Sequence, residues 1–316
     1  MAAVSVRDLG AGRMMIDLGF RDTEGLVASY LLPGEEGYTL VETGPTTCRA
    51  ALGAGLSAAG VDRSEVRRVL VTHIHLDHAG GLGAAAADFP KAAVFVHERG
   101  APHMIEPSRL AASARRAWGP ASDLLWGPIE PVPADRIVPL RGGEVLPLRG
   151  GELRPIYTPG HAQHHLAFFD TGIGALLTGD AAGVRLEGSP WPRPAIPPPD
   201  LDLEALFSSL AEMVRLSPRM VLYSHFGPST DALRELGSYR EEVVAWRETA
   251  LEAAQVDASV PHVAAALQRV EEARLRSAGS SPAEQPKSEL VSGYDLAAQG
   301  LLRYFRTHGL LPESPS

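Results

Sequence analysis

The sequence contains little cysteine and lacks long apolar runs. Cys48 is the only cysteine among 316 residues, so an intrachain disulfide is impossible and a disulfide-stapled secreted scaffold is excluded. No apolar run approaches the ~20 residues that a membrane-spanning helix needs. Residues 1–13 contain Arg7 and Asp8 and lack the apolar core of a signal peptide. We therefore expect a cytoplasmic protein that does not insert into membranes.

Basic residues are also in short supply. The chain has 29 Lys and Arg against 38 Asp and Glu, a formal net charge of -9. This charge disfavours binding to nucleic acid or to anionic lipid, and it favours a small-molecule substrate. With 45% hydrophobic and 21% charged residues, the composition is that of a globular protein with a sizeable core.

Strand-like and helix-like segments alternate along the first two thirds of the chain. Short apolar runs at 27–32, 69–71 and 93–96 predict strands, and the segments 50–59 and 80–88 predict helices. Further strands are expected at 14–20, 38–41, 145–148, 153–157, 166–169, 175–178 and 220–223. The pattern predicts an α/β protein with mixed sheets.

The C-terminal part is predicted to be helical. After a Pro-rich loop at 188–199 and an amphipathic helix at 202–216, residues 230–316 are helical apart from a linker at 277–286. We expect a catalytic domain at 1–229 and a helical extension at 230–316. The apolar runs of the extension must pack on the core, cover the active site or form a homodimer.

The segment His73-Ile74-His75-Leu76-Asp77-His78 places three imidazoles and a carboxylate directly after an apolar strand. In extended backbone, His73 and His75 point to the same side, so their ring nitrogens can converge on one cation. Asp77 and His78 belong to the turn that follows. This density of metal-binding side chains indicates a metal site rather than a polar surface turn.

Three more candidate ligands follow apolar strands at Gly-containing turns. They are His161 in Thr-Pro-Gly-His, Asp180 in Thr-Gly-Asp, and His225 in Tyr-Ser-His-Phe-Gly. Imidazole and carboxylate without thiolate suit Zn(II), Fe(II) or Mn(II). A bridging carboxylate would allow two such ions to lie ~3.5–4 Å apart with a hydroxide between them.

These motifs resemble the metallo-β-lactamase superfamily, whose pattern is His-x-His-x-Asp-His followed by a distant His, Asp and His. The resemblance implies an αββα sandwich over about 14–227 and two divalent metal ions, with zinc favoured and Fe(II) or Mn(II) as alternatives. One ion would be held by His73, His75 and His161, the other by Asp77, His78 and His225, with Asp180 bridging them. Catalysis is assigned to Asp77 and Asp180, Asp77 being the acceptor of a proton from the attacking hydroxide.

Several other residues lie near these motifs in the sequence. The family's Asp-Thr-Gly turn reads Glu42-Thr43-Gly44 here, and Glu42 either orients a ligand imidazole or faces solvent. His97 is expected to approach the site without binding metal, and at most one of His164 and His165 is expected to face it. The Pro-rich loop 190–199, with Trp191 and Arg193, is either a wall of the substrate site or a stiff surface connection.

The segments around His161, Asp180 and His225 are most similar to the glyoxalase-II-like branch, which hydrolyses thioesters, lactones and other esters. Lactonases of this kind carry a Tyr three residues after the bridging Asp, whereas Gly183 stands at that position. We expect a metal-dependent hydrolase of a small ester, lactone or thioester. A persulfide dioxygenase-like mono-iron oxidoreductase and a non-catalytic signalling protein that contains metal are the alternatives.

Overall fold

The computed structural model describes residues 5–280 and 286–312. The chain forms two compact units, one made of Met1–Tyr157 and His164–Gly179, the other of Thr158–Gln163 and Asp180–Ser316. The predicted division at 229/230 remains a prediction. Residues 281–285 of the predicted linker lie outside the described part of the chain.

The first unit contains a mixed sheet with the strand order β1-β2-β3-β4-β5-β6-β7. Neighbouring strands are antiparallel from β1 to β4 and parallel from β4 to β7. Every residue of β3 is buried, as expected for an apolar strand that is covered on both faces. The strands are β1 (Val6–Gly10), β2 (Arg13–Asp17), β3 (Ala28–Pro33), β4 (Tyr38–Val41), β5 (Val66–Leu70), β6 (Ala93–His97) and β7 (Ile137–Leu140).

Four antiparallel strands of a second sheet belong to the same unit, and they follow one another in sequence order. Arg13 of β2 donates from Nε to Asp170 of β10 at 2.9 Å, and both side chains are buried. This ion pair joins the two sheets inside the sandwich. The strands are β8 (Leu146–Leu148), β9 (Gly151–Tyr157), β10 (Leu166–Asp170) and β11 (Ala175–Gly179).

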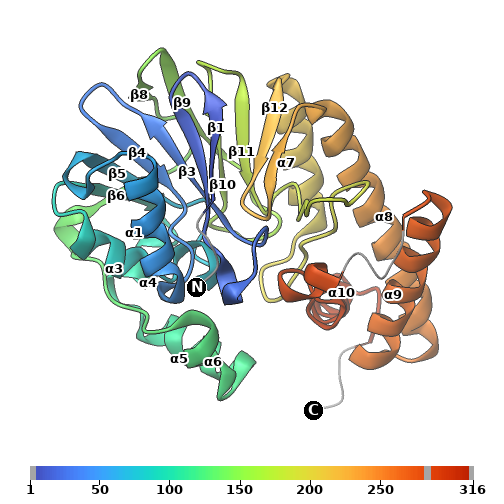
Figure 1. Ribbon diagram of the computed structural model, residues 1–316. Coiled ribbons are helices and arrows are strands. Elements are labelled where there is room, and N and C mark those ends of the chain that lie inside the picture. Colours follow the sequence, from blue (N-terminus) through green and yellow to red (C-terminus); the bar gives the residue numbers. More distant parts are fainter. Residues whose placement is uncertain (1–4, 281–285, 313–316) are drawn as a thin grey trace. The chain divides into compact units, whose positions relative to one another are not determined.

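Helices of the first unit flank its sheets (Figure 1), and α1 contacts β2. The residues of α1 that face inward are apolar, including Leu52 and Leu56. The helices are α1 (Arg49–Ala58), α2 (Leu76–Ala79), α3 (Leu82–Asp88), α4 (Ala101–Ile105), α5 (Ser108–Trp118) and α6 (Ala121–Trp126).

The second unit combines a strand pair with helices that end the chain. Strands β12 (Met220–Tyr223) and β13 (Gly227–Ser229) are antiparallel. Trp246, Tyr239 and Phe305 are fully buried and form the core between the helices. None of the helices in the described ranges is long and apolar enough to cross a membrane. The helices are α7 (Leu203–Arg215), α8 (Ala232–Val256), α9 (Val260–Ser277) and α10 (Tyr294–Thr307).

The predicted architecture of sheets with flanking helices and C-terminal helices is confirmed, with one boundary corrected. The strand expected at 14–20 ends at Asp17, because the Asp17 carboxylate accepts hydrogen bonds from the backbone of Gly19 and Gly25 at 3.0 and 2.8 Å. Gly19 has φ 55, a conformation that glycine adopts without strain. Phe20 therefore begins a short 3-10 helix instead of extending the strand.

Candidate metal centre

Four of the predicted ligands lie together in the first unit, after the end of β5. His73 and His78 are fully buried and His75 is half-buried. His73 Nε2 lies 2.9 Å from His75 Nδ1. Two nitrogens bound tetrahedrally to one zinc ion at about 2.0–2.1 Å would be ~3.3 Å apart. The pair therefore fits one ion, as the His-x-His spacing predicts.

Asp77 and His78 form a second pair on the short helix α2. His75, with ψ 152, is the extended residue before this helix, so the two residues that follow it are carried around the turn. Asp77 Oδ1 lies 3.9 Å from His78 Nε2. One helical turn thus presents a carboxylate and an imidazole side by side.

Glu42 supports this group from the end of β4. Its side chain is fully buried, and Oε1 lies 3.3 Å from His78 Nδ1 and accepts from Thr72 Oγ1 at 2.6 Å. A carboxylate at Nδ1 leaves Nε2 of the same ring available as a metal ligand. Because Glu42 is fully buried, the interpretation that it faces solvent is wrong. Its position beside His78 Nδ1 supports the interpretation that it orients the imidazole of a candidate ligand.

We expect Glu42→Gln to weaken metal binding about 10–100-fold, because an amide orients the His78 ring and raises its basicity less than a carboxylate does. Competition with a chromophoric chelator measures this affinity. Glu36→Gln, at an exposed position in the turn before β4, is the control and should leave the affinity unchanged. Equal affinities of the Glu42 variant and the unaltered protein would contradict the role assigned to Glu42.

The other three predicted ligands lie together in the second unit. His161, Asp180 and His225 are all buried. Asp180 Oδ2 lies 3.5 Å from His161 Nε2, and Asp180 Oδ1 lies 3.7 Å from His225 Nε2. The two carboxylate oxygens therefore face different imidazoles, which is the arrangement expected of a carboxylate that bridges two ions.

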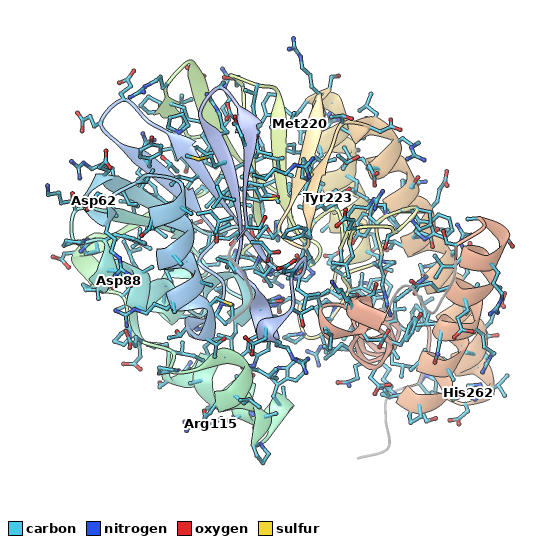
Figure 2. The ribbon with its side chains drawn as sticks, viewed as in Figure 1. Asp62, Asp88, Arg115, Met220, Tyr223 and His262 are labelled. Atoms are coloured by element: carbon cyan, nitrogen blue, oxygen red, sulfur yellow. The ribbon has the colours of Figure 1, made fainter. Side chains whose placement is uncertain are left out.

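Local backbone structure fixes His161 and His225. Gly160 has φ +137, and a Cβ at this position would lie 2.4 Å from Cα of Leu206 in α7, so only glycine fits before His161. His225 follows Tyr223, which ends the buried strand β12 (Figure 2). The carbonyl oxygen of His225 accepts a hydrogen bond from the backbone N–H of Arg185. Both imidazoles are thus carried on turns that rigid elements hold.

The donor set of both groups fits a divalent transition metal. It consists of imidazole nitrogens and carboxylate oxygens, and these suit Zn(II), Fe(II) and Mn(II) alike. Most of the donors are buried, and buried histidines and carboxylates that face one another at 2.9–3.9 Å are stabilised when a cation lies among them.

Of the other three histidines near the motifs, His97 packs on Tyr157, whereas His164 and His165 lie beside the candidate ligand His73. His97 stacks on Tyr157 with ring centroids 4.8 Å apart, its Nδ1 accepts from the backbone of Arg99, and burial lowers the pKa of its imidazole. His165 is fully buried, 4.9 Å from the ring of His73. His164 is half-buried, and its ring lies 6.2 Å from that of His73 and 5.9 Å from that of His75.

Gly183 lies in a position that has no room for a side chain. It has φ +80, and a Cβ there would lie 2.4 Å from both the Arg193 carbonyl oxygen and Cε2 of Tyr239. The tyrosine that lactonases carry three residues after the bridging Asp could not be accommodated without moving this backbone. The packing around residue 183 in the second unit therefore requires the glycine that the sequence has there.

Comparison with known proteins gives a family match over most of the chain. The model of the Metallo-beta-lactamase superfamily matches residues 22–225. A curated metallo-beta-lactamase fold-containing protein from Sulfurisphaera tokodaii is 38% identical over 72 residues, which is 23% of this chain and 26% of that protein. The chain thus matches about a quarter of the length of this curated relative.

The similarity to solved structures covers a larger part of the chain than the similarity to the curated relative. An archaeal metallo-beta-lactamase superfamily protein from Sulfolobus tokodaii has 25% identity and a TM-score of 0.59, covering 70% of this chain and 81% of its own. A metallo-beta-lactamase family protein from Thermus thermophilus has 26% identity and a TM-score of 0.64, covering 90% and 89%. A beta-lactamase domain protein from Burkholderia ambifaria, with 20% identity, a TM-score of 0.66 and coverage of 99% and 92%, supports the fold alone.

Proposed function

Because the chain belongs to the metallo-beta-lactamase superfamily, we propose that it is a dinuclear metal-dependent hydrolase of a small carboxylic ester, lactone or thioester. One ion binds to His73, His75 and His161, the other to Asp77, His78 and His225, and Asp180 bridges them. We propose zinc as the metal, the glyoxalase-II-like branch as the subgroup, and the cytoplasm as the location of the protein.

The observation that carries the proposal is the orientation of Asp180. Its Oδ2 faces His161 at 3.5 Å and its Oδ1 faces His225 at 3.7 Å. A carboxylate that bound one ion or capped a turn would not be expected to direct its two oxygens toward two different buried imidazoles. In the first unit, His73 faces His75 and Asp77 faces His78. The ring centroids of His73 and His78 lie 4.1 Å apart, so these four side chains form one cluster.

Two divalent ions in this donor set would supply a nucleophilic water at neutral pH and polarise the carbonyl of the substrate. The residues of the protein hold the metal-binding side chains in place and transfer the proton. Glu42 orients the His78 ring. Asp77, which is partly exposed, is the group to which we assign acceptance of the proton from the attacking water and its return to the leaving group.

The proposed substrate class follows from charge and chemistry. A formal charge of -9 opposes binding to a polyanionic nucleic acid. The carbonyl class comes from the local similarity of the His161, Asp180 and His225 segments to glyoxalase-II-like enzymes. No serine or cysteine nucleophile is required, because water attacks the carbonyl directly.

A hydrolysis screen tests the proposal. The purified protein is assayed with an aryl ester, an aliphatic lactone, a thioester and bis(p-nitrophenyl) phosphate, before and after metal removal. We expect cleavage of at least one carbonyl substrate, loss of that activity on chelation, and its recovery on adding metal. In oxygen-18 water the label should enter the product carboxylate without a trapped acyl-enzyme.

Other outcomes would overturn the proposal in recognisable ways. Oxygen uptake with a persulfide and one bound iron would indicate the dioxygenase. Cleavage of the phosphodiester alone would indicate a nuclease-type activity. Full metal content without turnover of any carbonyl substrate would favour the signalling protein.

A further inference from the structure

The Pro-rich loop 190–199 supplies the hydrogen-bond acceptor for the candidate ligand His161. His161 Nδ1 lies 2.8 Å from the carbonyl oxygen of Ala195, and the imidazole is 2% exposed. A carbonyl oxygen can only accept, so Nδ1 carries the hydrogen and Nε2 presents its lone pair. Nε2 is the nitrogen that faces Asp180 at 3.5 Å. Ala195 thus fixes both the tautomer and the direction of the ring.

Arg193 anchors this loop two residues before Ala195. Its backbone forms an antiparallel bridge with Val184, through hydrogen bonds of 2.8 and 3.0 Å. Its side chain is 5% exposed, so it turns away from solvent and into the second unit. The bridge also joins the loop to the segment that begins at Asp180. The loop therefore contacts the surroundings of two candidate ligands, His161 and Asp180.

The guanidinium of Arg193 is enclosed by the C-terminal helices. It lies 4.1 Å from the ring centroid of Tyr294 in α10 and 5.5 Å from that of Trp246 in α8. Its Nε lies 3.5 Å from the buried Glu271 of α9, and Nη2 donates to Glu289. Arginine can stack on aromatic rings and donate several hydrogen bonds to carboxylates, and lysine does not reproduce these interactions.

Helix α10 and the segment just before it contact the loop on both sides of Ala195. Ser292 Oγ donates to the Pro194 carbonyl at 2.6 Å, and Arg303 Nε donates to the Pro199 carbonyl at 3.1 Å. Gly300 of α10 lies against the loop, where a Cβ would be 2.0 Å from the Ile196 carbonyl oxygen. The six prolines among residues 190–199 restrict the loop further. The Ala195 carbonyl is therefore held in place by contacts from the C-terminal helical region.

We propose that Arg193 is a positioning residue for the metal centre: it couples the C-terminal helices to His161 through the carbonyl of Ala195. The extension then contributes to metal affinity without contributing a ligand. This inference rests on the proposed function, since it assigns a role to His161 as a ligand.

The test compares Arg193→Gln with Arg13→Gln. Arg13 is a matched control because it is also buried and also paired with a buried carboxylate, Asp170 at 2.9 Å, in the sheets of the first unit. Zinc affinities are measured by competition with a chromophoric chelator, and unfolding is followed in urea. We expect Arg193→Gln to weaken one of the two binding steps about 10–100-fold. Arg13→Gln should lower stability and leave both affinities unchanged.

A second readout reports on His161 directly. In the zinc-loaded protein with nitrogen-15 histidine, the long-range spectrum should show His161 with a protonated Nδ1, and Arg193→Gln should broaden or shift this signal. If Arg193→Gln does not fold, Ser292→Ala removes the donor to Pro194 and should weaken the same binding step to a smaller extent. Arg193→Lys keeps the charge and should restore the affinity only in part.

The failures of the two proposals are distinguishable. An unaltered protein that binds no metal would overturn the proposed function. Two bound ions with affinities that Arg193→Gln leaves unchanged would overturn the positioning role alone. An equal loss of affinity in Arg13→Gln would also overturn it, because the loss would then follow from reduced stability.

Discussion

Replacement of Asp180 by alanine is expected to lower hydrolysis about 10²–10³-fold or more and to reduce bound metal from two equivalents toward one. The physical reason is that Asp180 presents Oδ2 to His161 and Oδ1 to His225. Without the carboxylate, two cations would approach each other with no bridging negative charge to offset their repulsion. Elemental analysis and the initial rate with the best ester of the screen measure the two effects.

Two variants make this result specific to Asp180. Asp231→Asn removes an exposed carboxylate of the same unit that pairs with Arg234, and it should change neither metal content nor rate. Asp180→Asn keeps the shape and one carbonyl oxygen, so its metal content and rate should fall between those of alanine and aspartate. Full metal content with unchanged turnover in Asp180→Ala would contradict the dinuclear centre.

The second large effect is a contrast between His75→Ala and Cys48→Ser. His75 is placed against His73 at 2.9 Å, and its loss should abolish turnover because the ion bound there loses a ligand. Cys48 is buried, and burial raises the pKa of its thiol to about 12. At neutral pH the group is therefore a thiol rather than the nucleophilic thiolate. Cys48→Ser should leave turnover of the folded protein within about twofold, because no step of the proposed reaction uses the Cys48 thiol.

The rates of both variants are compared at equal concentrations of folded protein, checked by circular dichroism. A large loss in Cys48→Ser, together with a covalent acyl adduct found by mass spectrometry, would replace direct attack by water with a cysteine mechanism. Normal turnover in His75→Ala would remove His75 from the centre.

The sequence identifies the candidate ligands because their spacing and the strand ends around them are local features. His73 and His75 are two residues apart in extended backbone, which places both rings on one side, and the 2.9 Å approach of their nitrogens follows directly. Glu42 could be linked to a ligand only through the family resemblance. Its contact with His78 spans 36 positions and depends on how β4 and β5 pair.

The features that the sequence does not predict depend on contacts between distant segments. The hydrogen bond from His161 to Ala195 spans 34 positions, and the pairing of Arg193 with Glu289 spans 96. Neither leaves a periodic pattern in the chain. The sequence also does not predict the edge strands β1, β7 and β13. Val6–Gly10 is largely exposed, and Ile137–Leu140 and Gly227–Ser229 each contain a proline, features that are common in edge strands.

The most direct test of the central claim is the number of metal ions bound by the purified protein. Inductively coupled plasma mass spectrometry after gel filtration, with protein concentration from amino-acid analysis, gives the equivalents per chain. We expect close to two equivalents of a divalent transition metal in the unaltered protein and close to one in Asp180→Ala. One equivalent or none in the unaltered protein, after reconstitution with excess zinc, iron(II) or manganese(II), would contradict the central claim.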